Sequence, residues 1–215
     1  MKKFLALALS LLMILSLAAC GNKGTDAEQN DGPSSGKDTY LSLGTGGVTG
    51  TYYPLGGAFA NIITNNIDGY TCTAESTGGA VENAWMLARG EIDIGFVAAS
   101  TLYQAQHSEG DFSDGTAASI KGIVSIYDEV VQIVSCDPSI TSIEDLRGKK
   151  VAVGSAGSGT EVMARDLLTL YGMSYDDIGE DFLGFGDASN GLKDKTLDAA
   201  FIWAGMPTSG LLELG

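Results

Sequence analysis

Three short segments rich in glycine and hydroxyl residues have the composition of anion-binding loops. They span residues 45–51, 76–79 and 155–160, and each lies between a strand-like run and a run with helical periodicity. A helix N-terminus offers unpaired N–H groups and a partial positive charge, while glycine lets the backbone approach a ligand closely. Three such loops predict a cradle for a small anion, although each alone is also typical of an ordinary turn or cap.

The same residues do not complete a common catalytic motif. Residues 44–50 partly imitate a dinucleotide-binding loop, but no acidic residue plainly ends a following second strand. Residues 154–160 partly imitate a P-loop but lack its lysine. Neither Ser155 nor Ser158 has glycine two residues away on both sides, as a nucleophile elbow requires. We therefore predict no enzyme activity and no catalytic residue.

The single histidine and two of the three cysteines limit the remaining chemistry. His107 lies in a polar run that we expect in a surface loop, so neither a Ser-His-Asp triad nor a zinc site is predicted. Cys72 and Cys136 lie in strand-like runs and are interpreted as small buried hydrophobes. A disulfide between them stays open, because the sequence does not supply the geometry that the bond needs. We expect no cofactor and no metal.

The N-terminal residues predict export and a lipid anchor. Two lysines precede an apolar run that is too short to span a bilayer and has the layout of a signal peptide. Leu17-Ala18-Ala19-Cys20 resembles the bacterial lipobox, in which the cysteine is alkylated by a diacylglycerol and becomes the new N-terminus. We expect a signal peptide at 1–19, lipidation of Cys20 and a flexible polar linker through residue 37. An ordinary signal peptide with an incidental cysteine is the alternative.

Charge excludes one class of partner. The chain carries 12 basic and 27 acidic residues, a formal net charge of −15. Loss of Lys2 and Lys3 with the signal peptide leaves 10 basic against 27 acidic residues, or −17. Nucleic acid demands basic patches, so we expect no nucleic-acid partner. The acidity also opposes adsorption to anionic lipid, which leaves contact with the bilayer to Cys20.

Strand-like and helical segments alternate along the rest of the chain. The predicted strands are 40–44, 70–75, 92–98, 120–126, 130–135, 150–154 and 197–203. The predicted helices begin near Pro54, Ala80, Ser100, Glu161 and Ala188. Because several strands are continuously apolar, this α/β pattern predicts parallel-rich sheets with helices on both faces. Ligands in such folds bind at the carboxyl ends of strands, where the three loops lie.

Five segments also resemble the TAXI-type solute receptors of TRAP transporters, in family order. They are residues 44–54, 77–83, 90–95, 154–161 and 197–202. The resemblance implies a two-lobed, type II periplasmic-binding-protein-like fold, with lobe I at 38–135, lobe II at 136–215 and a hinge near Ser135 to Pro138. It implies that a small organic anion or amino acid, such as glutamate or a dicarboxylate, is enclosed between the lobes. TRAP membrane subunits would then receive it in ion-gradient-driven uptake.

The resemblance also carries over a set of ligand-binding positions. They are Thr45, Gly46, Gly47, Thr49, Tyr52, Ser76, Thr77, Ser155, Ser158, Thr160 and Trp203. Trp203 is interpreted either as a lid over an apolar part of the ligand or as core. Arg165 contributes only if its helix face turns inward.

Family members return to the first lobe after the second, so we expect the second lobe to be incomplete. The alternatives are an ABC-type or sensor-linked receptor on the same fold, or an exported hydrolase.

Overall fold

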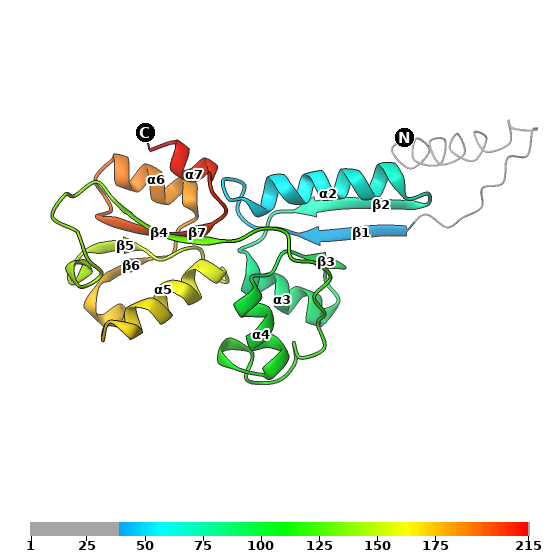
Figure 1. The fold of residues 1–215 in the computed structure, drawn as a ribbon, viewed down its shortest axis with the longest axis horizontal. Helices are drawn as coiled ribbons and strands as arrows, with labels where there is room; N and C mark the ends of the chain where they lie inside the picture. The colour runs from blue at the N-terminus through cyan, green and yellow to red at the C-terminus, as the bar shows by residue number, and fades with distance from the viewer. Residues whose placement is uncertain (1–38, 215) are drawn as a thin grey trace, which may run out of the picture. The chain divides into compact units, whose positions relative to one another are not determined.

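The computed structural model describes residues 39–214 (Figure 1). The predicted signal peptide, the lipid attachment at Cys20 and the linker lie outside these described residues. Within residues 39–214, no helix combines the length and the apolar character that crossing a membrane would require.

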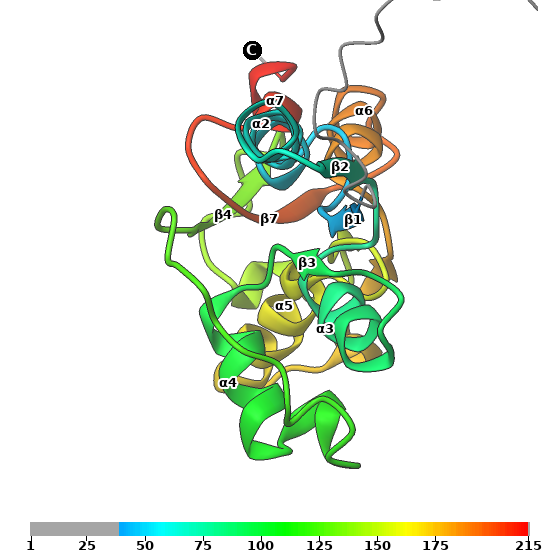
Figure 2. The ribbon, with the colours of Figure 1, turned by 90° about the vertical axis from the view of Figure 1, so that its right-hand side faces the viewer.

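The first sheet has three parallel strands in the order β2-β1-β3. Helix α2 covers one face of this sheet, and α3 lies on the other face together with α4 (Figures 1 and 2). Leu43, Cys72 and Phe96 pack under α2, which explains why the first two strands are apolar on that side. The elements are β1 (Thr39–Gly44), α2 (Tyr52–Asn66), β2 (Tyr70–Glu75), α3 (Ala80–Arg89), β3 (Ile94–Gly95), α4 (Ala99–His107) and the 3₁₀ turn η2 (Gly110–Phe112).

Helix α3 shows how the local sequence sets an element's ends. The predicted span, 80–89, is confirmed. Gly90 follows with φ of 69°, a left-handed conformation that glycine adopts without steric cost, and its N–H donates to the last carbonyls of the helix. The chain then turns directly into β3.

Strand β3 is shorter than the predicted strand 92–98. The Asp93 carboxylate accepts the Ser42 N–H at 2.8 Å and the Ser42 hydroxyl at 3.1 Å. The Ser42 N–H therefore donates to a side chain and not to a backbone carbonyl oxygen of the next strand. For this reason the pairing of β1 with β3 begins only at Ile94.

The second sheet has the order β4-β7-β5-β6, with β4 antiparallel to β7 and the other pairs parallel. Helix α5 covers one face, and α6 with α7 the other (Figures 1 and 2). The central strand β7 is almost entirely buried, which accounts for its continuous apolar run. The elements are β4 (Val130–Ser135), η3 (Glu144–Leu146), β5 (Lys150–Ala152), α5 (Gly159–Leu170), η4 (Tyr175–Asp177), β6 (Gly179–Asp181), α6 (Phe185–Lys193), β7 (Ala199–Ala204) and α7 (Ser209–Leu212).

The predicted strand 120–126 is wrong. This segment pairs with no strand of residues 39–214 and connects the two sheets, with Ile123 82% exposed. The apolar composition suits a strand, but a strand also needs a partner edge. The edge at β3 is only two residues long, and β4 takes the edge of the second sheet instead. Two further elements, the short polar edge strand β6 and the helix α7, were not predicted.

Strand β4 pairs with the second sheet, although the predicted boundary assigns it to lobe I. All six of its residues pair with β7, so β4 belongs with the second sheet rather than with lobe I. The predicted boundary at residue 135 would cut this strand from its own sheet. We therefore propose that the lobes meet through the connecting segment 120–129.

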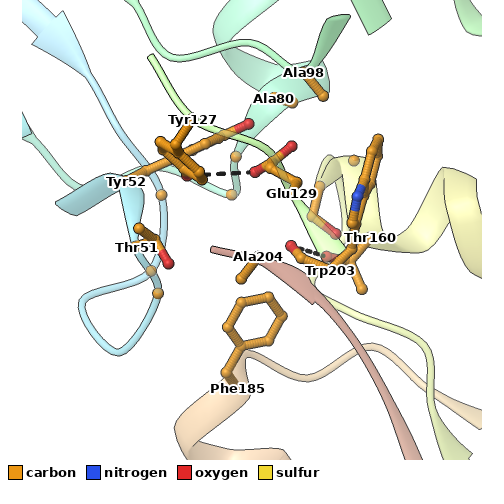
Figure 3. Close-up of a pocket in the computed structure, with 17 residues that line it drawn as sticks. Thr51, Tyr52, Ala80, Ala98, Tyr127, Glu129, Thr160, Phe185, Trp203 and Ala204 are labelled. Carbon is orange, nitrogen blue, oxygen red and sulfur yellow. Dashed lines mark hydrogen bonds between the residues drawn. The ribbon is translucent and has the colours of Figure 1, made fainter. Parts of the chain in front are cut away.

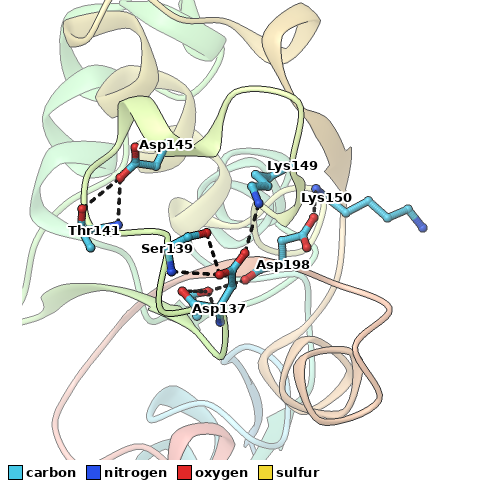
Figure 4. A network of polar contacts seen from close by, with 8 residues as sticks. Asp137, Ser139, Thr141, Asp145, Lys149, Lys150 and Asp198 are labelled. Carbon is cyan, nitrogen blue, oxygen red and sulfur yellow. Dashed lines mark hydrogen bonds and ion pairs between the residues drawn. The ribbon is translucent and has the colours of Figure 1, made fainter.

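Polar contacts hold residues 135–138 to the second sheet and argue against the hinge predicted there (Figure 4). The Ser135 hydroxyl donates to the Asp198 carbonyl oxygen at 2.6 Å. The Asp137 carboxylate accepts from the Ser139 hydroxyl at 2.7 Å and from Lys149 Nζ at 3.1 Å. The Ser139 and Lys149 hydrogen bonds lower the pKa of Asp137 to about 2. A hinge needs a segment with few hydrogen bonds to its surroundings. Because this turn makes several, we do not expect it to be the hinge.

The predicted surroundings of the cysteines and the histidine are partly confirmed. Cys72 is buried as expected, but Cys136 is exposed because it follows the last residue of β4, and both are free thiols. His107 is exposed as expected. It ends helix α4 rather than lying in a loop, with Nδ1 2.9 Å from the Tyr103 carbonyl oxygen.

Candidate functional site

A cavity lies where loops from both sheets meet the end of β7 (Figure 3). Its volume is about 60 Å³, which is room for about four to six water molecules or a small organic solute. The lining comprises Gly46, Gly47, Gly50, Thr51, Tyr52, Gly78, Gly79, Ala80 and Ala98 beside the first sheet, Tyr127 and Glu129 from the connecting segment, and Ser158, Gly159, Thr160, Phe185, Trp203 and Ala204 beside the second sheet.

The structure brings part of the predicted site together. The predicted positions that line the cavity are Gly46, Gly47, Tyr52, Ser158, Thr160 and Trp203. Their contact with a ligand stays a prediction.

Other predicted positions hold the loops in place instead of lining the cavity. Thr45 is fully buried, and its hydroxyl donates to the Glu75 carbonyl oxygen at 2.6 Å. The Thr77 hydroxyl donates to the Thr45 carbonyl oxygen at 3.1 Å, and the Ser76 hydroxyl donates to the Gly46 carbonyl oxygen at 3.0 Å. These hydroxyls are donors to the backbone of neighbouring loops, which makes them framework residues.

Asn83 completes this framework and was missed by the sequence analysis. It is fully buried in α3, and its Nδ2 donates to the carbonyl oxygens of Thr45 at 2.7 Å and Phe96 at 2.8 Å. Its Oδ1 lies 2.8 Å from the Thr77 hydroxyl and shares that hydroxyl's proton with the Thr45 carbonyl oxygen. One side chain therefore connects the loops that follow all three strands of the first sheet. A polar residue on the inward face of a predicted helix was the available signal.

Thr49 and Ser155 also lie outside the lining. The Thr49 hydroxyl accepts the Gly186 N–H at 3.0 Å, and its carbonyl oxygen accepts the Gly210 N–H at 3.1 Å. Thr49 thereby links the first loop to the elements around the second sheet. The Ser155 carbonyl oxygen accepts the Ser158 N–H at 3.1 Å, which closes the turn before α5.

Two helices begin at the cavity. Ala80 is the first residue of α3, and Gly159 and Thr160 are the first two of α5, so their N–H groups have no acceptor within their own helices. Ser158 caps α5, with its hydroxyl accepting the Glu161 N–H at 3.1 Å. These first turns offer backbone donors to a carboxylate or a sulfonate.

The chain already uses some of the donors at the start of α3. The Gly78 N–H donates to Glu82 Oε2 at 2.5 Å, and the Glu82 N–H donates to the Gly157 carbonyl oxygen at 2.9 Å. The predicted cradle at 76–79 is therefore partly filled by the Glu82 carboxylate. Among the lining residues, Ala80, Gly159 and Thr160 keep first-turn N–H groups that have no acceptor within their own helices.

Glu129 is the one carboxylate in the lining, and the sequence analysis did not single it out. The Tyr127 hydroxyl donates to its Oε1 at 3.4 Å. Burial raises the pKa of Glu129, and hydrogen bonds from Tyr52 and Tyr127 partly oppose that shift. Burial, together with the nearby Glu129 charge, raises the pKa of both tyrosines, so both hydroxyls remain protonated. No motif surrounds Glu129, and only its place between two sheets reveals it.

Trp203 forms a wall of the cavity. A methyl group at Gly159 would lie 3.2 Å from its ring, so the indole packs directly over the start of α5. Arg165, the residue considered for a carboxylate clamp, instead pairs with Asp111 at 3.0 Å and Glu161 at 3.5 Å. No Arg, Lys or His of residues 39–214 lines this cavity. The same part of the chain also contains no group of three His, Cys, Asp or Glu residues suited to a metal.

The sequence model of the NMT1-like family matches residues 43–214. The chain belongs to this family. The family description carries no transporter class, so the resemblance to TAXI receptors is not supported at that level.

Solved structures confirm the α/β, periplasmic-binding-protein-like fold of this NMT1-like chain. The alkanesulfonate-binding protein SsuA from Xanthomonas axonopodis pv. citri, bound to MOPS, is 18% identical with a TM-score of 0.51, covering 76% of this chain and 54% of that chain. The GluR0 ligand-binding core from Nostoc punctiforme, in complex with L-glutamate, is 18% identical with a TM-score of 0.51, covering 76% of this chain and 69% of that chain.

A third solved structure concerns glutathione import through GshT and the cystine ABC importer TcyBC of Streptococcus mutans. It is 14% identical with a TM-score of 0.50, covering 77% of this chain and 68% of that chain. The NMT1-like chain spans about half the length, 51–54%, of the first solved relatives that it matches.

Proposed function

We propose that this chain is an extracytoplasmic solute-binding receptor for a small organic solute that carries an acidic group. The observation that carries the proposal is the joint cavity, in which loops from both sheets and the first turns of α3 and α5 converge. The solved relatives with the same fold support it, because their names describe binding of an alkanesulfonate and of L-glutamate.

The proposed mechanism is binding without reaction. The acidic group of the solute accepts from the N–H groups of Ala80, Gly159 and Thr160, and closure about residues 120–129 buries it. The closed form presents the surface that the membrane subunits recognise. The lining supports a binding role over a hydrolase, because Ser158 uses its hydroxyl as a helix cap and no histidine of residues 39–214 lies beside it.

The transporter class is the next level of the proposal. The match to a structure described with a cystine ABC importer favours an ABC-type system. The five segments that resemble TAXI receptors support TRAP membrane subunits as the second candidate. Neighbouring genes distinguish the two, because an ABC system requires an ATPase subunit and a TRAP system requires a large membrane subunit without one.

The cellular location of the receptor is part of the same proposal. Its location outside the cytoplasm and its tether to the bilayer rest on the lipobox-like segment that ends at Cys20. Mass spectrometry of the mature N-terminus tests this proposal. A diacylglycerol-modified Cys20 supports the tether, and an unmodified cysteine after cleavage contradicts it.

Thermal-shift and calorimetric titration with amino acids, dicarboxylates and alkanesulfonates tests solute binding. We expect one solute per chain, and a raised Tm for at least one class. Gly159→Val places a side chain between Trp203 and Ala80 and should abolish binding. Gly57→Val is the matched control, because that helical glycine has no neighbouring atom within 4 Å of an added Cβ. Equal binding by both variants would place the solute elsewhere.

A further inference from the structure

We infer that Glu129 determines ligand specificity by binding a protonated amine, so that the solute is an amino acid rather than a dicarboxylate or a simple sulfonate. The inference rests on the proposed receptor function and narrows its ligand class. It depends on where Glu129 lies, on the charges around it and on the donors across the cavity.

Glu129 lies between the two sheets, beside the cavity. Glu129 comes from the segment that connects the two sheets and directly precedes β4. Its carboxylate lies between the tyrosine pair, Tyr52 and Tyr127, and the indole of Trp203 (Figure 3). A solute in this cavity therefore lies beside a carboxylate and aromatic rings.

The charge of Glu129 is not balanced by the described cavity lining. No Arg, Lys or His among the described lining residues neutralises Glu129. A partly buried carboxylate without a cationic partner is costly, because the tyrosine hydrogen bonds replace only part of the solvation that burial removes. The raised pKa of Glu129 agrees with this cost. An ammonium group on the ligand supplies the missing partner, whereas a second carboxylate on the ligand would be repelled.

The rest of the cavity completes the recognition of a zwitterion. The N–H groups at the start of α3 and α5 suit the carboxylate of the same ligand. The faces of Tyr52, Tyr127 and Trp203 attract a cation by their ring electrons. A quaternary ammonium could contact the aromatic faces, but it has no N–H to donate to the Glu129 carboxylate. A protonated primary amine can make both interactions, so it fits the site better.

The groups facing Glu129 also define its pH dependence. They are Tyr52 from α2 and Tyr127 from its own segment, while Trp203 from β7 does not titrate. Both tyrosines have raised pKa values and stay neutral. Glu129 alone therefore changes charge on mild acidification, and amine affinity should fall as the pH drops through its raised pKa.

Paired ligands test the inference by calorimetry on the purified protein. L-glutamate is compared with glutarate, and taurine with ethanesulfonate, because each pair differs in the amine. At least one amine-bearing member should bind about 30-fold or more tightly than its partner, the typical effect of removing one member of a buried charge pair. Glu129→Gln should remove that preference, and Glu129→Asp should retain it at lower affinity.

The outcomes separate this inference from the receptor function. Glu109→Gln, an exposed substitution of the same chemistry, should leave affinity unchanged. If solute binds but neither L-glutamate nor taurine binds more tightly than its amine-free partner, Glu129 does not select an amine, and the receptor function survives. If the folded wild-type protein binds no solute of either pair and none of the wider panel, both proposals fail. The wild-type comparison requires no variant to fold.

Discussion

The backbone N–H of Glu82 donates a hydrogen bond of 2.9 Å to the carbonyl oxygen of Gly157. This bond joins the first turn of α3, beside the first sheet, to the loop before α5, beside the second sheet. Gly157 has φ of +75°, and an added Cβ would lie 3.3 Å from the Cβ of Glu82. Close approach of the two lobes at the cavity therefore depends on a glycine.

Gly157→Ala should weaken solute binding about fivefold to tenfold, the equivalent of about 1–1.4 kcal/mol, because the closed arrangement becomes crowded. Gly148→Ala is the matched control. Gly148 has φ of +72° and no atom within 4 Å of an added Cβ, so it carries the same backbone strain without the contact. Calorimetry should show normal affinity for Gly148→Ala, and an equal loss in both variants would assign the effect to strain alone.

Glu129→Gln should raise the Tm of the solute-free protein at neutral pH. The folded-state pKa of Glu129 is raised, so the folded state holds the proton more tightly than the unfolded state does. The wild-type protein therefore loses stability as the pH rises from the ordinary glutamate pKa through the raised value, and the glutamine variant lacks this loss. Thermal unfolding across pH 4–8 should show two curves that converge at the acidic end. Parallel curves would mean that the Glu129 charge costs no stability.

Trp203 should report solute binding by its fluorescence. The chain has two tryptophans, and the other, Trp85, packs on Phe112 with ring centroids 5.1 Å apart, in a different cluster. Trp85→Phe should retain a spectral change on solute addition, whereas Trp203→Phe should lose it. The absence of any spectral change in Trp85→Phe, in which Trp203 is the only tryptophan, would show that the solute does not reach this wall of the cavity.

Asn83→Ala should destabilise the protein by about 2–3 kcal/mol or more, because it leaves buried carbonyl oxygens without donors. The free energy of unfolding in urea measures this. Asn66→Ala is the comparison, since Asn66 is exposed and makes one bond to its own helix. Equal effects of the two substitutions would contradict the framework role of Asn83.

Much of the fold follows from local patterns, as the start of the chain shows. Short runs of strand-favouring residues predict β1 and β2, and the helical periodicity of α3 with Gly90 after it defines that helix to the residue. The glycine loops between strand and helix indicate where a cavity forms. These signals lie within short windows, so they are visible without the tertiary structure.

The failures occur where distant parts of the chain decide the outcome. Residues 120–126 have a strand's composition, but this segment pairs with neither sheet: the β3 edge is only two residues long, and β4 is the strand that pairs with β7. Thr45 and Thr77 have the hydroxyls of a binding loop, but neighbouring carbonyl oxygens accept them. Glu129 becomes prominent only because the fold carries it to a cavity without cationic side chains in its described lining.

Native mass spectrometry of the protein, purified without denaturation and then titrated with a solute panel, tests the central claim most directly. We predict one non-covalently bound small solute per chain, and the released solute should carry both an amine and an acidic group. A folded protein that carries no solute and takes up none at millimolar concentration would contradict the receptor function.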